Sequence, residues 1–160
     1  DLLYIARDFV GVKPLYYFLN NTSLIFSSEL KAIVQNTQQL LKLNKEVLNE
    51  YLYYKYVSGK KTLIKNVHKF SPGKLYLFDL RNKNISVKIS NFYKFKETSH
   101  KETFLDTVEN TNTLLQKSVN LQLQSDADIG IQLSGGIDST LITDISSKKK
   151  HIKNNRLYVL

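Results

Sequence analysis

Short hydrophobic and aromatic runs, separated by polar turns, dominate the first 95 positions of the chain. Their length and residue types predict β-strands over residues 2–6, 15–19, 24–26, 74–80 and 85–89. Asn20 and Asn21 lie where a hairpin turn needs residues that tolerate positive φ. A Ser-Pro-Gly turn at 71–73 precedes the last two strands.

Hydrophobic positions at helical spacing predict two helices in this part of the chain, over 28–34 and 45–57. Ser27 or Ser28 is the expected N-cap of the first helix. The second helix carries four tyrosines, which could stack on nucleic-acid bases. We interpret them instead as packing groups of the core and of contacts between domains: Tyr51, Tyr53, Tyr54 and Tyr56.

The pattern changes near residue 91, and a long amphipathic helix is predicted over about 99–123. Ser99 and Glu102 form a capping-box signature at its start. One face of this helix carries Phe104, Leu105, Val108, Leu115 and Val119. The elements predicted after it are a strand, a turn, a helix and a strand, over 129–133, 134–136, 137–147 and 157–160. This order indicates a parallel sheet with a right-handed crossover.

The composition limits the classes of protein to which the chain can belong. Hydrophobic residues make up 42% of the 160 positions, and no hydrophobic run approaches the ~18 residues of a membrane span. The absence of cysteine excludes disulfides, thiolate zinc sites and a cysteine nucleophile within these residues. The net charge is +9, but only three of the 23 basic residues are arginines, so a dedicated nucleic-acid surface is not expected. The absence of methionine favours a piece of a longer polypeptide.

Residues 133–140 carry the pattern that points to chemistry, between a predicted strand and a predicted helix. Gly135 and Gly136 let the backbone approach an anion, toward which the first helical N–H groups point. Further donors are the hydroxyls of Ser134, Ser139 and Thr140. Together they predict a phosphate cradle, where a magnesium ion would offset the charge of Asp138. Two plainer interpretations stay open: an ordinary glycine turn, and Asp138 as a favourable charge in the first helical turn.

The pattern Ser-Gly-Gly-x-Asp-Ser at 134–139 resembles the pyrophosphate-binding loop of the N-type ATP pyrophosphatases. A Walker A loop is excluded, because no Lys-Ser/Thr pair follows the glycines. Residues 6–17 resemble the late strand–turn–strand of class II glutamine amidotransferase domains, and residues 70–76 resemble the Pro-Gly turn near the end of that domain. Residues 26–32 are similar to the segment that follows this strand–turn–strand in glutamine-dependent asparagine synthetases. The order and spacing of these segments make the chain similar to the glutamine-dependent asparagine synthetases over nearly its whole length.

This resemblance implies a fold that is α+β in one part and α/β in the other. Residues 1–90 would be the C-terminal part of an Ntn-type glutamine amidotransferase domain with its linker. Residues 91–160 would begin a parallel-sheet ATP-pyrophosphatase domain of the adenine nucleotide alpha hydrolase type. The implied residues for binding ATP and pyrophosphate are Leu133, Ser134, Gly135, Gly136, Ile137, Asp138, Ser139 and Thr140, with Asp138 also a magnesium ligand.

The implied activity is ATP-dependent synthesis of asparagine from aspartate and glutamine-derived ammonia, through a β-aspartyl-AMP intermediate, with release of AMP and pyrophosphate. The catalytic cysteine would lie upstream of Asp1 and the later synthetase residues beyond Leu160, so no catalytic residue is assigned here. The expected cofactors are ATP and Mg²⁺, and the expected partners are small-molecule substrates, with neither nucleic acid nor a membrane. A cytoplasmic location is expected because no targeting signal is evident, and a homodimer is compatible with the assignment.

Two alternatives stay open at this point. One is a related enzyme that forms a β-lactam or a sugar amide from another carboxylate, and the other is a non-catalytic module that binds nucleotide or RNA. Ala127-Asp128 and Thr140 depart from the Val-Pro and Ser that are more usual in the family. Arg7 and Asp8 are interpreted as a structural ion pair that sets the geometry of the first turn.

Overall fold

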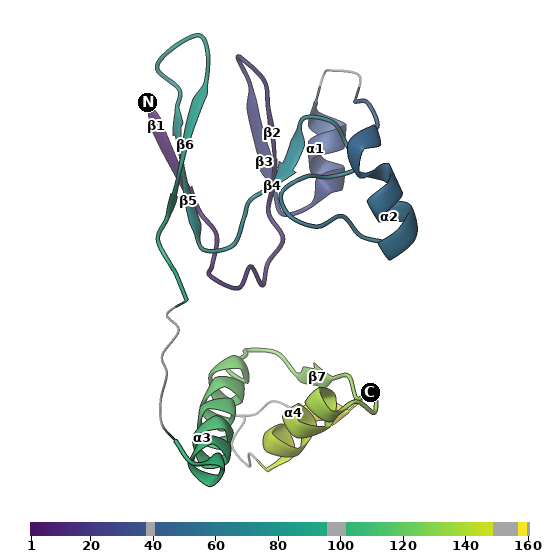
Figure 1. Cartoon of the computed structure of the whole chain (residues 1–160), viewed down its shortest axis with the longest axis vertical. Coiled ribbons are helices and arrows are strands. Elements are labelled where there is room, and N and C mark those ends of the chain that lie inside the picture. The colour runs from purple at the N-terminus through teal and green to yellow at the C-terminus, as the bar shows by residue number, and fades with distance from the viewer. Residues whose placement is uncertain (38–40, 96–101, 149–156, 160) are drawn as a thin grey trace. The chain divides into compact units, whose positions relative to one another are not determined.

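The structure is a computed structural model that describes residues 1–37, 41–95, 102–148 and 157–159. It consists of two compact units, Asp1–Glu97 and Thr98–Leu160, each with its own sheets and helices (Figure 1). Within the described ranges, no helix combines the length and the hydrophobicity needed to span a bilayer.

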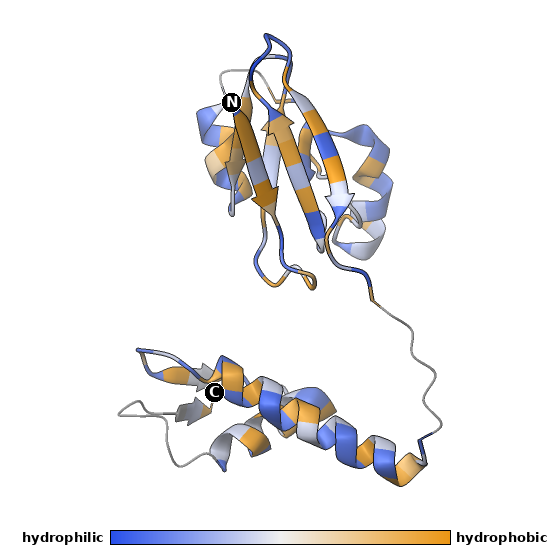
Figure 2. Ribbon diagram, turned by 90° about the vertical axis from the view of Figure 1, so that its left-hand side faces the viewer, coloured by the Kyte–Doolittle hydropathy of each residue, from blue (hydrophilic) through white to orange (hydrophobic). Residues whose placement is uncertain are grey.

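One antiparallel sheet of the first unit is formed by β1 (Leu2–Ala6), β5 (Lys74–Asp79) and β6 (Ser86–Asn91), in the order β1-β5-β6. In the centre of this sheet, Tyr76 lies opposite Ile5 on one side and opposite Ile89 on the other. Figure 2 shows hydrophobic and hydrophilic positions alternating along β6, as expected when one face of a sheet is packed, whereas β1 is hydrophobic along most of its length. The three strand predictions are confirmed to within two residues at each end.

A second antiparallel sheet contains β2 (Tyr16–Leu19), β3 (Leu24–Ser27) and β4 (Val67–Lys69), in the order β3-β2-β4. The hairpin between β2 and β3 turns at Asn20, whose Oδ1 accepts hydrogen bonds from two backbone N–H groups, those of Thr22 and Ser23. Neither asparagine of this turn has a positive φ, so the predicted reason for asparagine here is wrong. The side chain closes the turn instead. Strand β4 was not predicted, because three residues are too few to show a period.

Helix α1 (Leu30–Asn36) follows β3 and confirms the first helix prediction with a shift in its start. Its N-cap is Glu29, so the prediction of Ser27 or Ser28 at this position is wrong. The hydroxyl of Ser27 still supports the helix entry, because it accepts a hydrogen bond of 3.2 Å from the N–H of Glu29.

The second predicted helix is present as a short 3₁₀ turn, η1 (Lys45–Val47), followed by α2 (Leu48–Tyr54). It ends before residue 57 because Lys55 adopts a left-handed φ of 63°. Its tyrosine side chains are exposed in this unit, from 37% for Tyr51 to 80% for Tyr53. The prediction that these rings pack into the core of this unit is therefore wrong.

The core of the first unit has two clusters that meet at β2. Tyr17 and Phe18 are neighbours in this strand, so their side chains point to opposite faces of the sheet. Tyr17 packs against aromatic rings with centroid distances of 4.6–5.9 Å: Phe70, Tyr76 and Phe78. Phe18 packs with Ile33 of α1 and Val67 of β4. The β3-β2-β4 sheet is thus a middle layer, and burial there raises the pKa of Tyr17 to about 12.

Arg7, which follows β1, connects three segments of the first unit. Its guanidinium donates hydrogen bonds of 2.6–2.9 Å to the backbone carbonyls of Gly11, Lys13 and Phe70. Asp8 accepts a hydrogen bond from the N–H of Val12 at 2.9 Å, which is the main reason that the pKa of this carboxyl is lowered. A structural role for Arg7 is confirmed, but the predicted ion pair with Asp8 is absent from the contacts among the described residues.

His68 of β4 is partly buried beside Tyr17, with 5.4 Å between the ring centroids. Its Nδ1 is buried and has no hydrogen-bond partner in the part of the chain that the structure describes. Burial lowers the pKa of His68, and the positive charges of Lys60 and Lys61 lower it further. The folded protein therefore binds a proton at this ring less readily than the unfolded chain does.

We expect the chain to lose stability as the pH falls below about 6.5, the ordinary pKa of histidine, because the unfolded state takes up the proton first. The loss stops growing once the pH lies below the lowered pKa of the folded state. Urea midpoints of the wild type and of His68→Gln, measured between about pH 7.5 and 5.5, test this. The stability of the wild type relative to His68→Gln must fall between about pH 7.5 and 5.5, and a pH-independent difference would contradict the expectation.

The second unit contains α3 (Phe104–Gln122), β7 (Ile129–Ile131), α4 (Ile137–Ser147) and β8 (Leu157–Val159). β7 and β8 pair in parallel, with Ile129 opposite Leu157, and α4 lies between them in the sequence. The structure confirms the predicted order of strand, loop, helix and strand, and it confirms that these two strands pair in parallel.

Helix α3 begins later than predicted, and its capping box uses Thr103 as N-cap and Asp106. Ser99 of the predicted box lies outside the described residues. Val119 of the predicted hydrophobic face is buried, but Phe104 is 81% exposed. Most of that face is therefore uncovered within this unit.

Candidate functional site

The loop between β7 and α4 is the candidate site. Gly135 adopts a φ of +81°, a conformation that side chains with a Cβ rarely take, and Gly136 is the extended N-cap of α4. An added Cβ on Gly135 would meet nothing within 4 Å. The position therefore requires glycine because of its backbone conformation, and the space beside it is open.

The first backbone N–H groups of α4 follow directly after this loop, because Gly136 is the N-cap. The helical hydrogen bonds begin with the N–H of Thr140, which donates to the carbonyl of Gly136 at 3.0 Å. The preceding N–H groups have no acceptor among the hydrogen bonds of the described residues: Ile137, Asp138 and Ser139. Residues 134–138 are all exposed. Unpaired amides at the positive end of a helix suit an anion such as phosphate.

The three hydroxyl groups of the predicted cradle bond within the loop itself. Ser139 Oγ and Thr140 Oγ1 both donate to the carbonyl of Gly136, at 3.0 and 2.8 Å. Ser134 Oγ lies 3.0 Å from Ser139 Oγ, a contact in which either hydroxyl can be the donor. In this conformation the hydroxyls organise the loop, and the donors without an acceptor in the described part of the chain are main-chain amides.

Asp138 lies exposed in the first turn of α4, and its carboxylate has no hydrogen bond or ion pair among the described residues. The described residues contain no cluster of three or more groups able to hold a metal. A magnesium ion that is held mainly by phosphate oxygens needs only one or two protein carboxylates. Asp138 beside the loop amides therefore fits magnesium bound together with phosphates. Leu133, before the loop, is 44% exposed.

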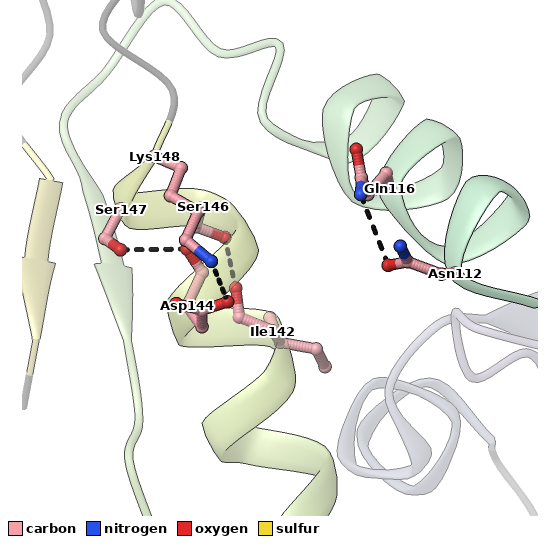
Figure 3. Close-up of polar contacts among 7 residues, drawn as sticks. All are labelled: Asn112, Gln116, Ile142, Asp144, Ser146, Ser147 and Lys148. Carbon is pink, nitrogen blue, oxygen red and sulfur yellow. Dashed lines mark hydrogen bonds and ion pairs between the residues drawn. The ribbon is translucent and has the colours of Figure 1, made fainter. Parts of the chain in front are cut away.

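A groove of about 270 Å³ lies between α3 and α4, and the sequence analysis did not predict it. Figure 3 shows polar side chains of these two helices. The groove is lined by Asn112, Gln116, Asp144, Ile145 and Lys148. Lys148 Nζ contacts Asp144 Oδ2 at 2.6 Å, so the two charges compensate each other. Polar pairs at this spacing are ordinary on helix surfaces, which explains why no sequence signal marked the groove. It lies at the C-terminal end of α4, whereas residues 133–140 lie at the other end.

Comparisons with known proteins give independent information on both units. Residues 1–93 match the family model described as glutamine amidotransferase domain, and residues 110–156 match the model described as asparagine synthase. The second match includes the whole loop at 133–140.

Individual relatives agree with the two family matches. The chain is 34% identical over 148 residues to asparagine synthetase [glutamine-hydrolyzing] 1 of Bacillus subtilis, covering 92% of this chain and 23% of the relative. It is 29% identical to the putative asparagine synthetase [glutamine-hydrolyzing] 2 of Methanocaldococcus jannaschii, covering 90% of this chain and 28% of the relative. It is also 27% identical to amidase chyE of Penicillium rubens, covering 89% of this chain and 21% of the relative.

The chain spans about a quarter of the length of these curated relatives. The predicted resemblance to glutamine-dependent asparagine synthetases is confirmed, because amidotransferase and synthase segments follow each other here in one chain. With residues 1–93 matched, more than half of its length, the chain belongs to the glutamine amidotransferase domain family, and it continues into an asparagine synthase segment.

Proposed function

We propose that the chain is part of a glutamine-hydrolysing asparagine synthetase, an ATP-dependent carbon–nitrogen ligase with glutamine as the nitrogen donor. Residues 1–90 would close the amidotransferase domain, and residues 91–160 would begin a parallel-sheet ATP-pyrophosphatase domain. The two family matches in this order, and relatives named asparagine synthetase, support this proposal.

The observation that carries the proposal is the free main-chain amides of the loop after β7. We assign the binding of ATP and of the departing pyrophosphate to the loop and the first turn of α4: Leu133, Ser134, Gly135, Gly136, Ile137, Asp138, Ser139 and Thr140. Asp138 would hold a magnesium ion, which, when bound, neutralises phosphate charge. The amides and the helix N-terminus would bind and orient the phosphates and stabilise the negative charge of the pyrophosphate leaving group.

In the proposed reaction, a β-carboxylate oxygen of aspartate attacks the α-phosphorus of ATP, and the bond to the β-phosphate bridging oxygen breaks. Pyrophosphate leaves and β-aspartyl-AMP forms. Ammonia released from glutamine then attacks the acyl carbon, and AMP departs with the acyl oxygen. The 160 residues contain no cysteine to act as the glutaminase nucleophile. We therefore expect that this chain alone does not complete the reaction.

Aspartate-dependent exchange between ATP and labelled pyrophosphate tests the proposal, with the protein made from the whole reading frame. We expect exchange that requires both aspartate and magnesium. Exchange with a different carboxylic acid, and none with aspartate, would favour a second candidate, a related ligase for another substrate. The similarity to a relative named an amidase rather than an asparagine synthetase is the reason to include other acids.

The proposed partners are the substrates aspartate, glutamine and ATP. We also propose a cytoplasmic location and a homodimer for the complete enzyme. Fractionation of cells and light scattering of the purified protein test these two expectations. ATP bound without any exchange, whichever acid is supplied, would instead favour a nucleotide-binding module.

A further inference from the structure

The carbonyl of Gly136 accepts three hydrogen bonds from the first turn of α4. Thr140 supplies two of them, from its N–H at 3.0 Å and from its hydroxyl at 2.8 Å, and the Ser139 hydroxyl supplies the third at 3.0 Å. The described peptide bonds are all trans, so a carbonyl and the N–H that follows it point in opposite directions. With the carbonyl of Gly136 turned along the helix, the N–H of Ile137 points out of the N-terminal end of α4, where residues 134–138 are exposed.

We propose that Thr140 is a positioning residue, whose hydroxyl holds the Gly136–Ile137 peptide so that the Ile137 N–H is ready for a phosphate oxygen. The inference rests on the proposed function. It changes the role of the Thr140 hydroxyl: this group does not donate to a phosphate itself, but holds in place the peptide whose N–H does. Threonine suits this role, because its branched Cβ restricts χ1 and its hydroxyl bonds the carbonyl four residues earlier in a helix. Ser139 differs, since its hydroxyl also contacts Ser134 Oγ.

Helix α4 offers a matched control for this role. The hydroxyl of Thr143 donates to the carbonyl of Ser139 at 2.7 Å, a bond of the same type one turn further along. Thr143→Val and Thr140→Val therefore delete the same kind of bond and change the same atoms. Only the Thr140 bond is accepted by the carbonyl of the Gly136–Ile137 peptide.

The test measures binding of magnesium pyrophosphate and of magnesium ATP to the protein from the whole reading frame, by calorimetry. We expect Thr140→Val to raise the Kd of both about 3- to 10-fold, the effect of one hydrogen bond. Thr143→Val should change it less than about 2-fold, and Thr140→Ser should restore binding to within about 2-fold. In the exchange assay, Thr140→Val should raise the KM for ATP with little change in kcat.

Equal effects of the two valine variants, or no effect of Thr140→Val, would overturn the positioning role while leaving the proposed function standing. A wild-type protein that binds neither probe overturns both. If Thr140→Val does not fold, Thr140→Ala replaces it, because alanine is the best helix former. The amide resonance of Ile137 gives a second readout: it should shift with pyrophosphate in the wild type and shift less in the variant.

Discussion

Asp138→Asn is expected to reduce aspartate-dependent ATP–pyrophosphate exchange by about a hundredfold while leaving the thermal midpoint nearly unchanged. The carboxylate is exposed and has no contact among the described residues that the substitution would break. What it loses is the negative charge that we assign to holding magnesium beside the phosphates. The measurement is initial exchange rate against magnesium concentration, and added magnesium should recover part of the loss.

Asp144→Asn is the matched control for this experiment. Asp144 is in the same helix, but it pairs with Lys148 near the C-terminal end. Its variant should keep the wild-type exchange rate and the wild-type dependence on magnesium. If Asp138→Asn exchanged as fast as Asp144→Asn at every magnesium concentration, the metal role of Asp138 would be rejected, and a helix-dipole role would suffice.

Arg7→Met is expected to destabilise the first unit by about 4 kcal/mol, because three backbone carbonyls lose a charged donor. These carbonyls belong to Gly11, Lys13 and Phe70, so the loss loosens the first loop from the segment that leads to β5. Urea unfolding followed by the tyrosine signal measures the change, since the chain has no tryptophan.

Two variants make this result specific. Arg7→Lys should recover part of the stability at most, because an ammonium group cannot reproduce the fork of the guanidinium. Arg81→Met removes an exposed arginine that pairs with Asp79, and it should cost much less. If the Arg7→Met and Arg81→Met variants unfold at the same urea concentration, the three carbonyls do not need Arg7 for the stability of the first unit.

The strands and the loop of the candidate site could be predicted because their signals are local. Short hydrophobic and aromatic runs at 2–6 and 74–80 mark two strands of the first sheet, and glycine at 135 reflects a φ of +81°. Helix ends were predicted less well. Ser99 with Glu102 and Thr103 with Asp106 show nearly the same capping signature, four residues apart. The end of α2 at Lys55 carries no glycine to mark it.

Contacts between distant segments could not be predicted from neighbouring residues. Their adjacency in the sequence predicts Asp8 as the partner of Arg7, yet the carbonyl of Phe70, 63 positions away, accepts one of the hydrogen bonds of Arg7 at 2.6 Å. The exposed tyrosines of α2 show the same limit, because helical spacing does not say which face meets a core. In the loop, the residue types were evident, but the use of two hydroxyls on the carbonyl of Gly136 was not.

By itself, the sequence determined the order of the elements other than β4, the glycine-rich loop at the start of α4 and the family resemblance. These depend on residue types and short spacings, which act through backbone preference and side-chain periodicity. The tertiary structure alone decided which groups are left free to bind. Among the residues that the structure describes, the Ile137 N–H has no acceptor and the hydroxyl of Thr140 has one, because hydrogen bonds form only where the folded chain places donors and acceptors together.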